Sequence, residues 1–239
     1  MLITTIKTHK IKPGESIIEI LDRYLPALSE KSIVAVTSKI ISIAEKNLAD
    51  KDKNKMTLIK KEADTVFPAP AKQKGFHLTL KNHRLMPNGG IDESNCRNFH
   101  VLLPKNPQLT TKKIWNHLRK KHQLKNLGVI ITDSSTTTPL RRGVTGITVG
   151  WCGFKPIYSY IGQKDIFGSK MKVSQINLLD SLATSAILNM GEGNEQTPMA
   201  TINHLPPTIK FQNRAPTKKE QKETYIDFKN DLFSSIMSL

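Results

Sequence analysis

The chain has 239 residues, of which 36 are Lys or Arg and 20 are Asp or Glu, so its formal net charge is +16. With 38% hydrophobic residues, the composition excludes an acidic disordered chain and a collagen-like one, and the length allows a buried core. No apolar stretch approaches the ~18 residues of a membrane span, Met1 to Lys7 lacks the apolar segment of a signal peptide, and two cysteines are too few for a disulfide framework. These features predict a cytoplasmic protein without a membrane partner.

Much of the positive charge is concentrated in one predicted helix. Between Leu109 and Lys125 the sequence has six Lys or Arg and no acid, and Ile114, Trp115 and Leu118 recur at helical spacing. This pattern predicts an amphipathic helix with a basic outer face, which is either a solvated surface or a contact for polyanions. Aromatic residues are only 6%, and no segment matches an RNA-recognition or helix-turn-helix signature, so a nucleic-acid partner is not expected.

Hydrophobic periodicity and the positions of Pro and Gly predict the elements along the chain. In chain order they are a helix over 17–25, a strand over 32–37, a helix or sharp turn over 38–45, a helix over 57–66, strands over 76–80 and 99–103, the basic helix over 109–125, strands over 127–132, 144–151 and 170–176, a helix over 179–190 and a last helix over 221–237. Ser16 is the expected N-cap of the first helix, and Gly191 ends the helix over 179–190. The mixture predicts an α+β fold with antiparallel-rich sheets.

Three polar loops hold a quarter of the acids in this basic chain. The loops are residues 88–95, 132–135 and 190–196, and their five acids are Asp92, Glu93, Asp133, Glu192 and Glu195. Each loop follows an apolar element and combines a carboxylate with Gly, Ser or Asn, which is the composition that holds a hard divalent cation bridging phosphates. The alternative is that Asp and Asn here only make turns and helix caps.

In order and spacing, these loops resemble the γ-glutamyl ligase family that adds glutamate to the deazaflavin coenzyme F420. The segments that carry the resemblance are 38–45, 88–95, 129–134, 141–143, 160–168 and 190–193, and the likeness runs from about residue 8 to residue 203. It implies one ligase-like unit over 1–239, with a helix-rich, nucleotide-contacting subdomain (1–74 plus 177–239) and a β-rich, metal- and dimer-forming subdomain (75–176). It also implies an intertwined homodimer that uses GTP or ATP with Mg²⁺ or Mn²⁺.

The resemblance also assigns roles to residues. Asp92 and Asp133 would hold one metal ion, with Ser134 and Glu192 serving a second. The nucleotide contacts would be Thr8, His9, Lys10, Ile11, Ser38, Lys39, Asn95, Gly191, Gly193, Asn194, Glu195, Gln196 and Thr197. One position departs from the family, because Ile43 stands where members often carry a Lys that contacts the phosphates or the nucleotide.

The acceptor is a separate question. Residues 190–198 and 135–140 are similar to a branch proposed to add glutamate to a folate instead of the deazaflavin coenzyme. This choice rests on subfamily likeness, so both a folate and a deazaflavin acceptor stay open, as do the nucleotide and the number of glutamates added.

The expected chemistry activates a carboxylate as an acyl phosphate, which the amine of glutamate then attacks. Carboxylate-held metal ions neutralise the phosphate charge in such a step. The catalytic candidates are Asp92 and Asp133, together with Arg141 and Arg142. These two arginines and Lys164 could bind phosphate or carboxylates or could be surface charge beside a turn. Two alternative functions remain: a metal-dependent phosphohydrolase and a non-catalytic polyanion-binding protein.

Overall fold

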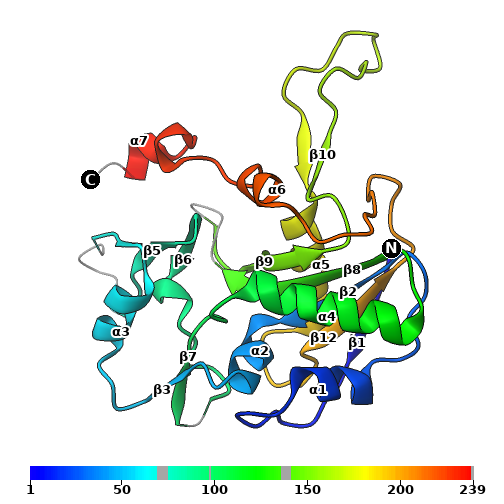
Figure 1. Ribbon diagram of the computed structural model, residues 1–239. Helices are drawn as coiled ribbons and strands as arrows, with labels where there is room; N and C mark the ends of the chain where they lie inside the picture. The colour runs from blue at the N-terminus through cyan, green and yellow to red at the C-terminus, as the bar shows by residue number, and fades with distance from the viewer. Residues whose placement is uncertain (69–74, 97, 136–140, 238–239) are drawn as a thin grey trace.

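A computed structural model describes residues 1–68, 75–96, 98–135 and 141–237 (Figure 1). Its centre is a five-stranded sheet in the order β1-β12-β2-β8-β9. The strands are β1 (Leu2–Ile6), β12 (Met199–Asn203), β2 (Ser32–Thr37), β8 (Leu127–Ser135) and β9 (Thr145–Cys152). Only the β2–β8 pair is parallel, and the other neighbours are antiparallel. The α+β class with antiparallel-rich sheets is therefore confirmed.

Helices cover both faces of this sheet. Strand β2 is buried on both sides: Val34 and Val36 pack with α1 (Ile17–Tyr24), α2 (Ser38–Ala44) and α4 (Pro107–His122), while Ile33 and Ala35 pack with α5 (Leu178–Met190). This two-sided burial explains the continuous apolar run of the strand. In Figure 1, α4 crosses in front of the sheet that it covers. Ile114, Trp115 and Leu118 of α4 are buried in the core, and the lysines of this helix are exposed.

Smaller units surround the central sheet. One is a lobe formed by α3 (Lys55–Glu62), β4 (Thr65–Val66), β5 (Leu78–Lys81), β6 (Arg84–Pro87) and the 3-10 turn η1 (Asn88–Gly90). The second is the antiparallel pair of β3 (Leu48–Asp50) and β7 (Phe99–Val101). The third is a hairpin of β10 (Ile157–Ser159) and β11 (Gln175–Asn177). The hairpin stands out from the body as an arm (Figure 1). The chain ends with α6 (Lys218–Lys222), η2 (Phe228–Asn230) and α7 (Ser234–Met237).

Local capping explains several boundaries. Ser16 accepts a hydrogen bond from the Glu19 N–H at 3.4 Å and begins α1, which ends before Pro26. Helix α5 ends at Gly191, whose φ of +79° is accessible to glycine at little cost. The predictions over 17–25, 32–37, 38–45 and 179–190 are confirmed because each depends on a local pattern.

Other sequence predictions were wrong in their bounds or their type. The helix over 57–66 stops at Glu62, and residues 65–66 form strand β4 instead. The last helix over 221–237 is replaced by short pieces: α6 has no buried residue, so no apolar face stabilises a long helix there. The strand over 170–176 shrinks to β11, and β8 extends to Ser135, which places Asp133 inside a strand.

Strands β1, β3, β6, β10 and β12 lie outside the strands predicted from the sequence. The central sheet contains strands from both predicted subdomains. Strands β1, β2 and β12 fall in the residue ranges predicted for the nucleotide-contacting subdomain, and β8 and β9 fall in the range predicted for the other. The division into two subdomains stays a prediction. Within the described ranges, no helix is long and apolar enough to cross a membrane.

Candidate active site

A cleft of about 890 Å³ opens at one edge of the central sheet. Strands β1, β2 and β8 run in the same direction, so their carboxyl ends meet at this edge. The segments that follow them, residues 8–13, the start of α2 and the end of β8, form part of the wall. The loop after η1 and the loop after α5 complete it. The three acidic loops of the sequence therefore meet in one place.

The carboxylate of Asp92 is held from three directions. The backbone of Asp92 pairs with Val101 of β7 through two N–H to C=O bonds of 2.9 Å. Its Oδ2 lies 2.6 Å from Lys39 Nζ, and its Oδ1 accepts a hydrogen bond from the Ser94 N–H at 2.7 Å. Burial raises the pKa of Asp92, but the hydrogen bond and charge of Lys39 and the hydrogen bonds of Ser94 together outweigh burial, so the pKa lies below its ordinary value.

Asp133 lies in β8 and also lines the cleft. The register of the β8–β9 pair shifts between Ile131 and Thr132, directly before Asp133, and such irregularities re-aim side chains. Ser38, the first residue of α2, donates its hydroxyl to Asp133 Oδ1 at 2.7 Å. Burial raises the pKa of Asp133 to about 7, against the effect of the Ser38 bond, and the charges of Asp92 and Glu192 contribute to the rise.

Glu192 is the third acid of the cleft, in the turn after α5. Burial raises its pKa, and the charges of Asp92 and Glu195 act in the same direction. The Ser134 hydroxyl donates a hydrogen bond to the Glu192 carboxylate, which opposes the rise. Lys39 lowers the pKa of Asp92, Asp133 and Glu192 alike, so one ammonium group balances all three acids.

The donor chemistry of this cluster fits a hard divalent cation. Carboxylate and hydroxyl oxygens from Asp92, Asp133, Ser134 and Glu192 border the same cleft, and the acids disfavour each other's charged form. In the described part of the chain, however, no group of three His, Cys, Asp or Glu is arranged to hold a metal ion as it stands. Because Lys39 is bonded to Asp92, we expect cation binding to move this ammonium aside.

The loop from Gly191 to Pro198 forms a lip of the cleft. A Cβ on Gly191 would lie 2.3 Å from the Glu195 carboxyl carbon, so the Glu195 side chain would have to move, and the φ of +79° strains any residue other than glycine there. Glu195 Oε2 accepts a hydrogen bond from the Gly193 N–H at 2.8 Å, and Asn95 Nδ2 donates to the Gly193 carbonyl at 2.9 Å. The loop is therefore closed on itself and tied to the turn that carries Asp92.

A second set of hydrogen bonds connects this loop to the segment after β1. The Thr8 N–H donates to the Gln196 carbonyl at 3.1 Å, and Gln196 Nε2 donates to the Thr8 carbonyl at 2.6 Å. His9 contacts Tyr24 Oη through Nδ1 at 2.7 Å and Glu15 Oε2 through Nε2 at 2.6 Å, which orients its ring. Backbone amides and oriented side chains thus surround a space lined partly by isoleucines.

Most of the residues predicted from the sequence meet in this cleft. The lining contains all four predicted metal ligands and every predicted nucleotide contact except Ser38, which reaches the site through Asp133. Arg141 and Arg142 are exposed and do not line the cleft, and residues 136–140, part of the folate-branch likeness, lie outside the described residues. Lys164 lies on the exposed arm.

Several lining residues were missed. Ile40, Ile43, Ile187 and Met190 supply apolar wall, although the last two belong to a helical stripe that signals only core packing in the sequence. Lys51, Glu93 and Cys96 also line the cleft. Burial raises the pKa of the Cys96 thiol, so it is not an activated nucleophile. No sequence signal places Lys51 here.

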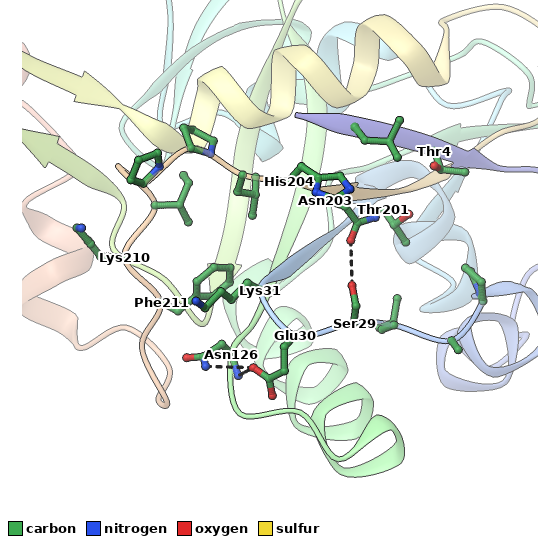
Figure 2. A pocket seen from close by; sticks show the side chains of 18 residues that line it. Thr4, Ser29, Glu30, Lys31, Asn126, Thr201, Asn203, His204, Lys210 and Phe211 are labelled. Carbon is green, nitrogen blue, oxygen red and sulfur yellow. Dashed lines mark hydrogen bonds between the residues drawn. The ribbon is translucent and has the colours of Figure 1, made fainter.

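A second cavity of about 910 Å³ lies at the other end of β1 and β12 (Figure 2). Figure 2 shows Ser29 bonded to Asn203, at 3.3 Å between Oγ and Oδ1, and Asn126 bonded to Glu30. None of the predicted site residues lines it. The two cavities are nearly equal in volume, so size does not identify the candidate active site. The acid cluster and the loop from Gly191 to Pro198, here called the glycine loop, identify it instead.

Comparisons with known proteins place the chain in one enzyme family. A family model described as F420-0:gamma-glutamyl ligase matches residues 5–204. The chain is 32% identical over 209 residues to a coenzyme F420:L-glutamate ligase of Methanocaldococcus jannaschii, covering 80% of this chain and 82% of the relative. It is 29% identical over 208 residues to one from Methanococcus maripaludis strain C7 (79% and 81%), and 38% identical over 128 residues to one from Methanosarcina mazei (53% and 49%).

Proposed function

We propose that this chain, which belongs to the F420-0:gamma-glutamyl ligase family, is a nucleoside-triphosphate-dependent ligase that joins L-glutamate to a carboxylate acceptor through an amide bond. The observation that carries the proposal is the meeting of Asp92, Asp133 and Glu192 beside the glycine loop in one cleft. Relatives named as coenzyme F420:L-glutamate ligases support it.

The reaction that we propose has two steps. The acceptor carboxylate attacks the terminal phosphorus of GTP or ATP, which gives an acyl phosphate and releases the nucleoside diphosphate. The glutamate amine then attacks the acyl carbon, inorganic phosphate leaves, and the amine loses a proton. A bound Mg²⁺ or Mn²⁺, as one or two ions, would neutralise phosphate charge, and Asp92, Asp133, Ser134 and Glu192 are the residues that would hold it.

The other residues of the cleft have binding roles in this proposal. Lys39 balances the three acids and, once displaced, is placed to contact the phosphates. The 8–11 segment, Asn95 and the 191–198 loop offer backbone amides and polar side chains to the nucleotide. Ile43 and its apolar neighbours provide a dry wall suited to a flat ring. Arg141 and Arg142, which are exposed and outside the lining of the cleft, are proposed to bind carboxylates or phosphate.

The acceptor has a flat ring system and a free carboxylate, as both a folate and a deazaflavin coenzyme precursor do. The likeness of residues 190–198 to the folate branch favours a folate, while the names of the relatives favour coenzyme F420. A cytoplasmic location fits either acceptor and stays a prediction.

We also propose that the protein works as a homodimer. The arm carries large apolar side chains at its tip, where Ile166 is 92% exposed and Phe167 is 88% exposed. The tip is ordered by Asp165, whose Oδ1 accepts hydrogen bonds from the Phe167 and Ser169 N–H groups, both at 2.9 Å. An ordered apolar tip of this kind is suited to burial against a second copy of the chain.

A mass-spectrometric ligase assay tests the proposed function. Purified protein receives glutamate, Mn²⁺, GTP or ATP, and either a reduced folate or the deazaflavin coenzyme precursor. Extension of one acceptor by a glutamyl unit supports the ligase and identifies the acceptor, and Asp133→Asn protein should give no product. Nucleotide hydrolysis that ignores glutamate and both acceptors would favour the phosphohydrolase, and salt-sensitive RNA binding without turnover would favour the polyanion-binding alternative.

A further inference from the structure

Asp92 and Glu93 are adjacent acids with different partners. Asp92 faces Lys39, at 2.6 Å between Oδ2 and Nζ. Glu93 Oε2 instead lies 2.6 Å from Nζ of Lys55, the first residue of α3, and Glu93 Oε1 lies 3.1 Å from His100 Nδ1. The hydrogen bond and charge of Lys55 hold the pKa of Glu93 below its ordinary value. A carboxylate fastened to its own two partners is poorly placed to serve as another metal ligand.

His100 is the unusual member of this group. It lies in β7, where it pairs with Ala49 of β3, and its side chain is only 3% exposed. Neither ring nitrogen has a well-aligned hydrogen bond to any described residue, so the ion-pair contact to Glu93 is the polar interaction that this buried ring makes within the described chain. A buried polar group without a partner is costly, and that cost draws the Glu93 carboxylate toward the strand.

The group is connected directly to Asp92. The backbone of Asp92 is paired with Val101, which follows His100 in β7. Glu93 is the next residue of the same turn. Its contact with Lys55 connects the turn to α3, and its contact with His100 connects it to β7. With both sides fixed, the Asp92 carboxylate points to Lys39 and the cleft.

We infer that Glu93 is a positioning residue that, with His100 and Lys55, holds the Asp92–Ser94 turn in the geometry that binds the cation. This inference rests on the proposed function for its consequence in binding, but its structural part stands alone. Partners that orient metal ligands typically change metal affinity by roughly 10-fold when removed.

The structural part is tested on metal-free protein by hydrogen–deuterium exchange. In Glu93→Ala protein, the amides of residues 91–96 should exchange several-fold faster than in the wild type, because the turn loses one attachment. Asp22→Ala is the matched control, because Asp22 also contacts one His and one Lys, His117 Nε2 at 2.7 Å and Lys121 Nζ at 2.9 Å, and links α1 to α4 instead of this turn. Equal exchange over 91–96 in Glu93→Ala and wild-type protein would overturn the inference.

The binding part uses Mn²⁺ titration calorimetry and ligase kinetics. Glu93→Ala should weaken Mn²⁺ binding roughly 10-fold, while kcat at saturating Mn²⁺ stays within about twofold. Glu93→Gln, which keeps an oxygen acceptor for Lys55 or His100, should recover most of the Mn²⁺ affinity. A purely electrostatic effect of Glu93 would instead leave Glu93→Gln binding Mn²⁺ as weakly as Glu93→Ala does.

Unchanged Mn²⁺ affinity in Glu93→Ala overturns the positioning role while leaving the ligase intact. Wild-type protein that binds no Mn²⁺ contradicts the metal site of the proposed function, and the exchange result then decides the positioning role.

Discussion

Lys39 Nζ lies 2.6 Å from Asp92 Oδ2, and the same ammonium lowers the pKa of Asp133 and Glu192. A lysine at the start of α2 thus neutralises part of an acid cluster assembled from three other segments. Where a divalent cation is proposed to bind, the metal-free protein holds a side-chain cation of its own. This relationship leads to the first prediction.

Lys39→Met should destabilise the metal-free protein, because three carboxylates then repel one another without a countercharge. We expect a loss of about 1 kcal/mol in unfolding free energy, or a fall of roughly 2–4 °C in Tm. Added Mn²⁺ should recover this loss, which thermal unfolding with and without chelator measures. Lys81→Met, which breaks the Lys81–Glu62 pair outside the cleft, should lose stability that Mn²⁺ does not restore. Equal losses with and without Mn²⁺ for Lys39→Met would contradict the prediction.

Asp133 should make stability depend on pH in an unusual direction. Its pKa is about 7 in the folded chain against an ordinary value of 3.8, so the folded state binds more protons between these values. The Asp133 contribution to the unfolding free energy therefore falls as pH rises from about 4 to 7. Asp133→Asn removes this pH-dependent contribution. Between pH 4 and pH 8, the unfolding free energy of the variant should therefore rise relative to that of the wild type, by on the order of 2 kcal/mol. Urea unfolding of metal-free protein measures this difference, and parallel pH profiles of the two proteins would refute it.

The lip of the cleft offers a matched pair of glycine substitutions. Gly191→Ala places a Cβ 2.3 Å from the Glu195 carboxyl carbon at a backbone φ of +79°, whereas the nearest atom to a Cβ on Gly193 is 3.4 Å away. Gly191→Ala should therefore distort the loop and raise the KM for the nucleotide by about 10-fold or more, and Gly193→Ala should change it by less than about threefold. Steady-state kinetics at saturating glutamate and acceptor test this order. Equal effects of the two substitutions would mean that the loop geometry does not control nucleotide binding.

The arm tip should control the oligomeric state. Replacing Ile166 and Phe167 together by Asp places two charges where the proposed dimer contact is apolar, so a dimer should dissociate to monomers. Sedimentation velocity of wild-type and variant protein measures the change. Leu188→Asp is the control, because Leu188 is 82% exposed on α5 and lies outside the arm. A monomeric wild-type protein, or a variant that remains dimeric, would remove the arm from the proposed interface.

Elements with a complete local signal could be predicted from the sequence. Strand β2 is an unbroken β-branched and apolar run, and α1 has an N-cap Ser16 and a limiting Pro26. Strands β1 and β12 also contain β-branched residues, but each has only five residues, and they are stabilised by pairing with one another across about 200 residues of sequence. The predicted final helix failed for the opposite reason, because a helical pattern without a surface to cover is not stabilised.

The sequence by itself determined the α+β class, the α4 amphipathic face and the three acidic loops, because periodicity and composition are local properties. Only the tertiary structure decided which acids share a cleft, since that depends on the parallel pairing of β2 with β8 and on the loop after α5. It also decided that Asp92 is paired with Lys39, that Asp133 is held by Ser38, and that Glu93 turns to His100. Burial and Coulomb interactions are set by distances between side chains, and residues far apart in the chain acquire those distances only when it folds.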